Sequence, residues 1–188
     1  MNLQSLLDRF AIRVDVRVLL DKWSESHRHY HNLNHLNDLV AQINESLGDG
    51  DINENERDKL LIAALFHDIV YEPDRKDNEE RSSNMFINLC GSKDHPSILE
   101  INRIILDTKN HQPSSKLSEK FMEFDMNIVE RDFDELLEWE EGIREEYKMY
   151  SNEDYKNGRL EFLESVLYKY PHNMDNLLDL IGWVKSKY

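Results

Sequence analysis

A histidine followed directly by an aspartate lies within the most apolar segment of the chain. In residues 60–71 (LLIAALFHDIVY), positions 60, 63, 64, 67, 68 and 71 follow the spacing of one helix face, which puts His67 and Asp68 on or beside an apolar stripe. A buried imidazole and carboxylate are costly unless a partner compensates them, and a divalent metal ion binds both groups. The alternative is a helix-end histidine beside a surface acid, because a single His-Asp pair is expected by chance.

A second feature is the concentration of histidine in residues 27–35 (HRHYHNLNH), which hold half of the eight histidines of the chain. His31 and His35 are four residues apart and would share one face of a helix. The alternative is a solvated helix start or an adventitious surface metal site. The string Tyr30-His31-Asn32 followed by His35 is specific enough to favour a functional site.

His35, the pair His67-Asp68 and the distant Asp125 reproduce an H…HD…D motif, and here the chain resembles the HD-domain metal-dependent phosphohydrolase superfamily. The similarity is greatest to a branch of small HD-superfamily phosphohydrolases with no assigned substrate, and it extends over about residues 20–170. The strings that carry it are RHYHNLNH (28–35), FHDIVYE (66–72), DNEERSS (77–83), TKNH (108–111) and FDMNI (124–128). The first string is also similar to the YHN motif of class I cyclic-nucleotide phosphodiesterases.

The resemblance implies a metal centre held by His35, His67, Asp68 and Asp125. Two imidazoles and two carboxylates suit Mn²⁺, Fe²⁺, Ni²⁺, Co²⁺ or Zn²⁺ better than Mg²⁺ alone. Such an ion would activate water for the hydrolysis of a small phosphate ester or nucleotide. Whether one or two ions bind, and which substrate is cleaved, stays open at this point.

Catalytic groups beyond the ligands are also implied by the resemblance. His31 would protonate the leaving oxygen, or alternatively pack against Tyr30 as a structural group. Glu72, Asp77 and Glu79 follow the His-Asp pair, where related hydrolases place acids that orient water. We take Glu79 first, because the string Asn-Glu-Glu (78–80) matches the family branch, and Glu72 second. Asp77 is explained equally well as a helix cap.

The acidic composition limits the partners that the protein can have. There are 23 Lys and Arg against 38 Asp and Glu, a formal net charge of −15, which disfavours non-specific nucleic-acid binding and membrane surfaces. A small phosphorylated substrate would need local cations. We expect Arg28 to bind the phosphate, and the resemblance implies His111 and Arg144, which lie in matching strings, as further substrate-binding residues. Salt bridging on a helix surface is the alternative for Arg144, and a loop histidine without a role is the alternative for His111.

The elements that would position these residues are all helical. We expect a single compact HD-domain-like all-α domain over residues 1–188, with about seven to nine helices. The expected ranges are 3–22, 33–47, 54–71, 78–91, 96–109, 117–129, 132–150 and 152–170, with a last helix near 175–186. Side-chain oxygens that could cap helix starts belong to Asn53, Asp77, Asp132 and Ser151, each followed three residues later by an acid.

The single cysteine, Cys90, and the absence of a long apolar run favour a cytoplasmic protein. The oligomeric state is not determined by the sequence, and we expect Trp23 and Trp183 to lie on the surface, where they could mark an interface. The alternative to an enzyme is a non-catalytic HD-fold module with a structural or ligand-sensing metal site. Because His31 and the nearby acids supply groups beyond the metal ligands, the sequence favours the enzyme.

Overall fold

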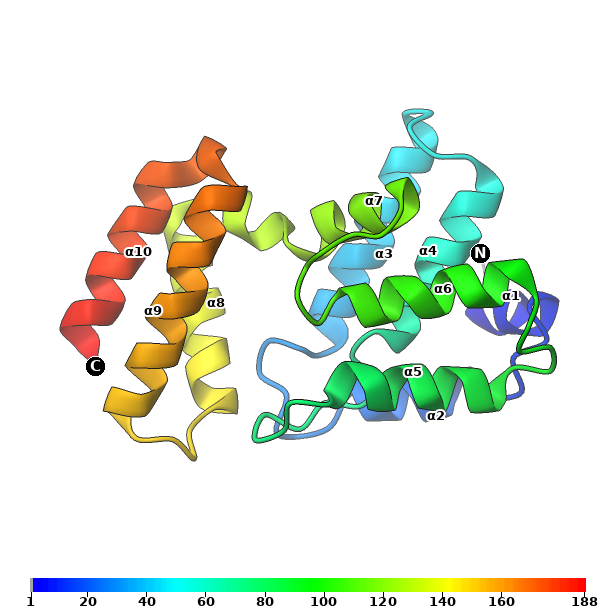
Figure 1. Ribbon diagram of the computed structural model, residues 1–188, viewed down its shortest axis with the longest axis horizontal. Coiled ribbons are helices and arrows are strands. Elements are labelled where there is room, and N and C mark those ends of the chain that lie inside the picture. The colour runs from blue at the N-terminus through cyan, green and yellow to red at the C-terminus, as the bar shows by residue number, and fades with distance from the viewer. Residues whose placement is uncertain (1) are drawn as a thin grey trace. The chain divides into compact units, whose positions relative to one another are not determined.

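The computed structural model describes residues 2–188, and within that range the chain forms ten α-helices, two short 3₁₀ helices and no β-strand (Figure 1). The all-α prediction is confirmed, with one helix more than the upper expectation. The elements are α1 (Leu3–Arg9), α2 (Val16–Trp23), α3 (Leu33–Gly48), α4 (Glu54–Phe66), α5 (Asn78–Leu89), α6 (Pro96–Asp107), α7 (Lys116–Asp125), η1 (Asn127–Glu130), α8 (Phe133–Glu146), α9 (Asn152–Lys169), η2 (Pro171–Asn173) and α10 (Met174–Lys187). Among these described residues, none of the helices combines the length and apolarity needed to cross a membrane.

The chain divides into two compact units, one reaching to Phe124 and the other spanning Asp125–Tyr188. In the second unit, α10 packs against both α8 and α9, and the three helices lie side by side (Figure 1, yellow to red). In the first unit, α4 packs against α3 and α6, while α5 packs against α6. The expectation of a single domain stays a prediction.

Helix α4 is buried on every side in its C-terminal half. All seven residues of the segment 60–66 have no exposed surface. A helix enclosed in this way cannot leave its last carbonyl groups to water, so these groups require partners from the protein.

The four last carbonyl groups of α4, from Ala63 to Phe66, all accept hydrogen bonds. Their donors are, in chain order, the amide of His67, the Nδ1 of His67, the indole nitrogen of Trp23 and the amide of Ile69, at 2.8, 3.0, 3.0 and 3.3 Å. Two of the four donors are therefore side chains, and the side chain of His67 is one of them.

The expected helix over 54–71 is five residues too long. Beyond Phe66 the backbone amides form hydrogen bonds with side chains of α5 instead of continuing the helix. The amide of Val70 donates to Ser82 Oγ and that of Glu72 donates to Asn78 Oδ1, both at 3.1 Å. Pro73 adds to this effect, since the residue before a proline avoids the helical region.

The single helix expected over 3–22 is wrong, because the chain forms α1 and α2 with a turn between them. Ala11 has a φ of +53°, and backbone pairing with a distant segment holds the turn: Arg13 donates to the carbonyl of Leu89, and Gly91 donates to that of Ala11, both at 2.9 Å. A Cβ at Gly91 would lie 3.2 Å from the Ala11 oxygen, so this approach favours glycine. The helix expected over 117–129 similarly divides into α7 and η1.

Three of the four expected caps are confirmed. Asn53 forms a full capping box with Glu56, and the side chains of Asp132 and Ser151 accept hydrogen bonds from the amides of Glu135 and Asp154. The fourth expectation is wrong. Asp77 makes no cap hydrogen bond, because both of its oxygens accept from Arg75 instead.

The capping box gives a stability prediction. Replacing Asn53 by Ala leaves the amides of Asn55 and Glu56 without their acceptor, so the free energy of unfolding should fall by about 1 kcal/mol. Urea unfolding followed by circular dichroism measures the change. Asp77→Ala is the matched control at an uncapped helix start and should cost less. An equal loss in both variants would contradict the assignment.

Cys90 gives a prediction about reactivity. Burial raises the pKa of its thiol to about 11, with nearby Lys93 acting weakly in the opposite direction. At pH 8 only about one thiol in a thousand is then ionised, and the thiolate is the reactive form. Alkylation by iodoacetamide should therefore be slow in the folded protein and fast in 8 M urea. Similar rates in the two conditions would show that Cys90 is not enclosed.

Candidate metal centre

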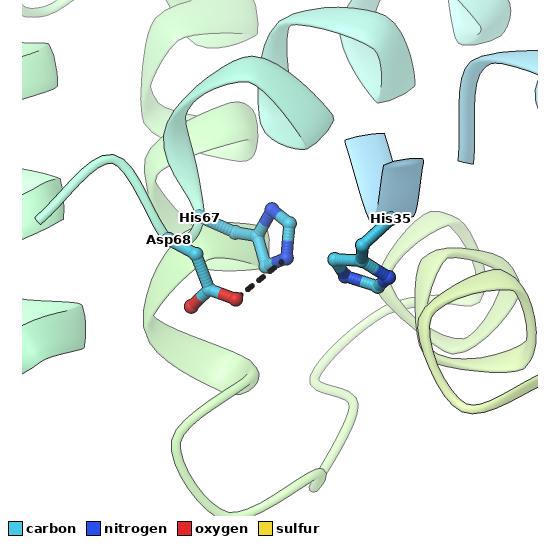
Figure 2. Close-up of side chains that lie close together, drawn as sticks. All are labelled: His35, His67 and Asp68. Carbon is cyan, nitrogen blue, oxygen red and sulfur yellow. Dashed lines mark ion pairs between the residues drawn. The ribbon is translucent and has the colours of Figure 1, made fainter. Parts of the chain in front are cut away.

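Three of the four expected metal ligands lie together in the first unit. His35 stands in the first turn of α3, His67 caps the C-terminal end of α4, and Asp68 follows it. Their potential ligand atoms all lie within 4.8 Å of one another (Figure 2). Both histidines are buried, with 7% and 1% of their surface exposed, while the Asp68 side chain keeps 15%.

The hydrogen bond of His67 to the end of α4 determines which ring nitrogen faces this group. A carbonyl oxygen can only accept, so the bond of Nδ1 to Ala64 places the ring hydrogen on Nδ1. In the neutral ring, Nε2 then presents its lone pair, and it lies 3.2 Å from Oδ2 of Asp68. Two lone pairs at this distance repel each other. A proton shared between the two groups, or a metal cation, therefore has to lie between them.

His67 and Asp68 are spaced as two ligands of one metal ion would be. Two ligand atoms bound to one ion at about 2.0–2.2 Å, with ligand–metal–ligand angles of 90–109°, stand about 2.8–3.6 Å apart. The 3.2 Å between His67 Nε2 and Asp68 Oδ2 falls in this range. Two imidazoles beside a carboxylate are the donor set of Zn²⁺, Fe²⁺, Co²⁺, Ni²⁺ or Mn²⁺ rather than of an all-oxygen Mg²⁺ site.

Aromatic rings enclose the two histidines. The ring centroid of Trp23 lies 5.5 Å from His67 and 6.2 Å from His35, and Phe121 meets His67 edge-on at 5.4 Å. The expectation that Trp23 lies on the surface is wrong, because its exposed fraction is 0%. The signal was present in the sequence: Leu19 stands four residues earlier, and both residues form the buried face of α2.

His31 lies near the candidate metal ligands, but it is not on the helix that the sequence predicted for it. It lies in the turn before α3, which begins at Leu33, so it does not share a helix face with His35. Its ring is nevertheless 6.0 Å from that of His35, and its Nε2 is 4.0 Å from Oδ2 of Asp68. At 22% exposure, its side chain lies nearer to solvent than that of His67.

Two tyrosines hold the ring of His31. Tyr71 stacks on it with centroids 4.3 Å apart, and Tyr30 meets it edge-on at 5.0 Å. His31 therefore packs against Tyr30, as the alternative structural role predicts, and it also lies close to Asp68.

Among the acids after the His-Asp pair, Glu79 is the one whose pKa is affected by the charge of Asp68. It is the second residue of α5 and is partly buried. Burial raises its pKa, and the negative charge of Asp68 acts in the same direction. Glu72 is more exposed and pairs with Arg81 at 2.7 Å. These contacts favour Glu79 over Glu72 as the acid near the site.

The side chain of Arg28 is completely enclosed, with 0% exposed. Its guanidinium donates to three backbone carbonyls and one carboxylate, those of His31, Asp68, Ile69 and Glu25. In this structure the group faces the protein instead of solvent. The structure therefore favours a positioning role over the phosphate contact expected from the sequence.

The remaining candidates stay predictions. Asp125 ends α7 and begins the second unit, so its role as fourth ligand rests on the sequence motif. His111 lies in the loop between α6 and α7 with a φ of +48°, an uncommon conformation for a residue other than glycine. Arg144 belongs to the second unit, where it donates to the carbonyls of Tyr147 and Tyr150 at 2.9 and 3.2 Å.

No family model, curated protein or solved structure matches the chain. The resemblance to the HD superfamily therefore stays a prediction from the motif strings.

Metal binding should stabilise the folded protein, because an ion bound only by the folded state raises the free energy of unfolding. At a free concentration one hundred times Kd the gain is about 2.7 kcal/mol. Thermal unfolding of the chelator-treated protein, with and without added Co²⁺ or Zn²⁺, should show a rise in Tm. Asp68→Asn keeps the side-chain shape and should lose this rise, whereas Asp94→Asn, at an exposed turn, should keep it. A rise of equal size in both variants would place the ion elsewhere.

Proposed function

We propose that the protein is a divalent-metal-dependent phosphohydrolase that cleaves a small phosphate ester or nucleotide. The observation that carries this proposal is the 3.2 Å approach of His67 Nε2 to Asp68 Oδ2 in a buried site. This approach requires a proton or a cation between the two groups, and His35 would supply a further nitrogen ligand beside them. The H…HD…D motif supports the same assignment from the sequence.

His35, His67 and Asp68 would hold the ion, and Asp125 is the fourth ligand that the motif implies. When bound, a divalent ion lowers the pKa of water and offsets the negative charge of a phosphoryl oxygen. This charge matters for a chain of net charge −15, because the nearby guanidinium of Arg28 is enclosed and cannot meet the substrate.

His31 would give a proton to the leaving oxygen as its bond to phosphorus breaks. The imidazole lies 4.0 Å from Asp68 and is partly exposed, so a substrate phosphate at the site could reach it. Stacking on Tyr71 holds the ring in this position. Glu79, close enough to Asp68 for their charges to interact, would orient the attacking water through its carboxylate.

One observation favours a second candidate function. His35 and His67 are nearly fully buried, and structural metal sites are closed while catalytic sites keep an open position. A non-catalytic module with a structural or ligand-sensing ion would share the three ligands. It would have no need of His31 as a proton donor, so the two functions differ in what the loss of His31 does.

The enzyme is tested by a hydrolysis screen of protein reconstituted with Mn²⁺, Fe²⁺, Co²⁺, Ni²⁺ or Zn²⁺. The panel is p-nitrophenyl phosphate, its bis-ester and a set of nucleotides. Activity should require the metal, and His31→Asn should lower kcat by about 10²–10⁴-fold while the ion stays bound, as expected for the loss of a general acid.

His29→Asn, an exposed histidine of the same string, is the matched control and should keep wild-type kcat. Stoichiometric metal without hydrolysis of any substrate would instead support the non-catalytic module. Wild-type kcat in His31→Asn would exclude the assigned proton donor.

A further inference from the structure

We infer that Arg28 is a positioning residue that fixes the ligand Asp68 and the proton donor His31 relative to each other. This inference rests on the proposed function, and it assigns to Arg28 a role that differs from phosphate binding. One nitrogen of Arg28 donates hydrogen bonds to two segments that are distant in the sequence.

That nitrogen is Nη1 of Arg28. It donates to the carbonyl of Asp68 at 2.8 Å and to the carbonyl of His31 at 3.1 Å. The two carbonyls belong to the turn after α4 and the turn before α3, which the sequence places 37 residues apart. Because both accept from one donor atom, the backbones that carry the ligand and the imidazole cannot separate without breaking a hydrogen bond.

The other nitrogens of the guanidinium are also occupied. Nη2 donates to the carbonyl of Ile69 at 3.3 Å, and Nε donates to Glu25 at 3.1 Å. Its Cζ lies 5.4 Å from the ring centroids of both Trp23 and Tyr71. A buried charge is costly unless it is paired and hydrogen-bonded, and here both conditions are met. The group would lose several contacts by turning toward a phosphate.

The four acceptors around this position match the planar guanidinium group of arginine. Arginine offers five N–H donors in a fixed plane and can reach a carboxylate and three carbonyls at once, whereas lysine offers a single ammonium on a flexible stem. A lysine keeps the charge and much of the apolar stem but cannot join all four acceptors. Arg28→Lys therefore separates the effect of positioning from the effect of charge.

The expected consequence is a looser metal site. Residues that hydrogen-bond to a metal ligand without binding the metal themselves typically change metal affinity by 10–100-fold when they are mutated. We expect Arg28→Lys to weaken Co²⁺ binding by at least about tenfold and to change the visible absorption of the bound Co²⁺, which reports ligand geometry. The far-ultraviolet circular dichroism should stay unchanged. The matched control is Arg17→Lys, an exposed arginine paired with Asp15, which should bind Co²⁺ as the wild type does.

The experiment is a titration of the metal-free full chain with Co²⁺ alone. Equal affinity and an equal spectrum in the wild type and Arg28→Lys would overturn the inference while leaving the proposed function intact. Absence of Co²⁺ binding by the wild type would overturn the proposed function and the inference with it. A raised KM in Arg28→Lys with unchanged Co²⁺ binding would indicate a substrate contact and would also overturn it.

A second variant covers the case in which Arg28→Lys does not fold. Glu25→Ala removes the acceptor of Nε from a partly exposed position and leaves the three carbonyl contacts in place. It should weaken Co²⁺ binding in the same direction by a smaller factor. Unchanged binding in Glu25→Ala, when Arg28→Lys does not fold, would overturn the inference.

Discussion

Helix α4 ends inside the first unit, where its last carbonyl groups cannot be satisfied by water. Most of the remaining site follows from how the protein supplies their partners. His67 covers two of these carbonyls with its amide and its Nδ1, and Trp23 covers a third with its indole. Beyond the helix end, the guanidinium of Arg28 donates to the next carbonyl groups, those of Asp68 and Ile69. His67 therefore both closes the helix and belongs to the site, and Trp23, which closes the helix beside it, contacts both site histidines.

This arrangement couples stability to chemistry through His67. Because Nδ1 is engaged by the helix, Nε2 is left to face Asp68, and the ring is held there by Trp23 and Phe121. A ligand that is oriented by a backbone carbonyl through its second nitrogen is the usual arrangement of metal-binding histidines. The enclosed position strengthens the repulsion between the two lone pairs unless a proton or a cation lies between them.

Local periodicity in the sequence was sufficient for the all-α class. The grouping of His35, His67 and Asp68 was predicted by the resemblance of the motif strings and not by periodicity. The sequence was not sufficient for the end of α4, which depends on partners from α5, nor for the break between α1 and α2, which depends on pairing with Leu89 and Gly91. The role of Arg28 was hidden for a related reason. Residue type indicates a cation for phosphate, and only the three-dimensional contacts show that the guanidinium is enclosed.

The proposal depends on a divalent transition metal held by the buried group of His35, His67 and Asp68. Elemental analysis of untagged protein, purified without added metal beside His67→Ala and Asp68→Ala, tests it most directly. We expect about one ion per chain in the wild type and loss of that ion in both variants. No metal in the wild type, even after incubation with Mn²⁺, Fe²⁺, Co²⁺, Ni²⁺ and Zn²⁺, would contradict it. The positive charge between His67 and Asp68 would then be a proton.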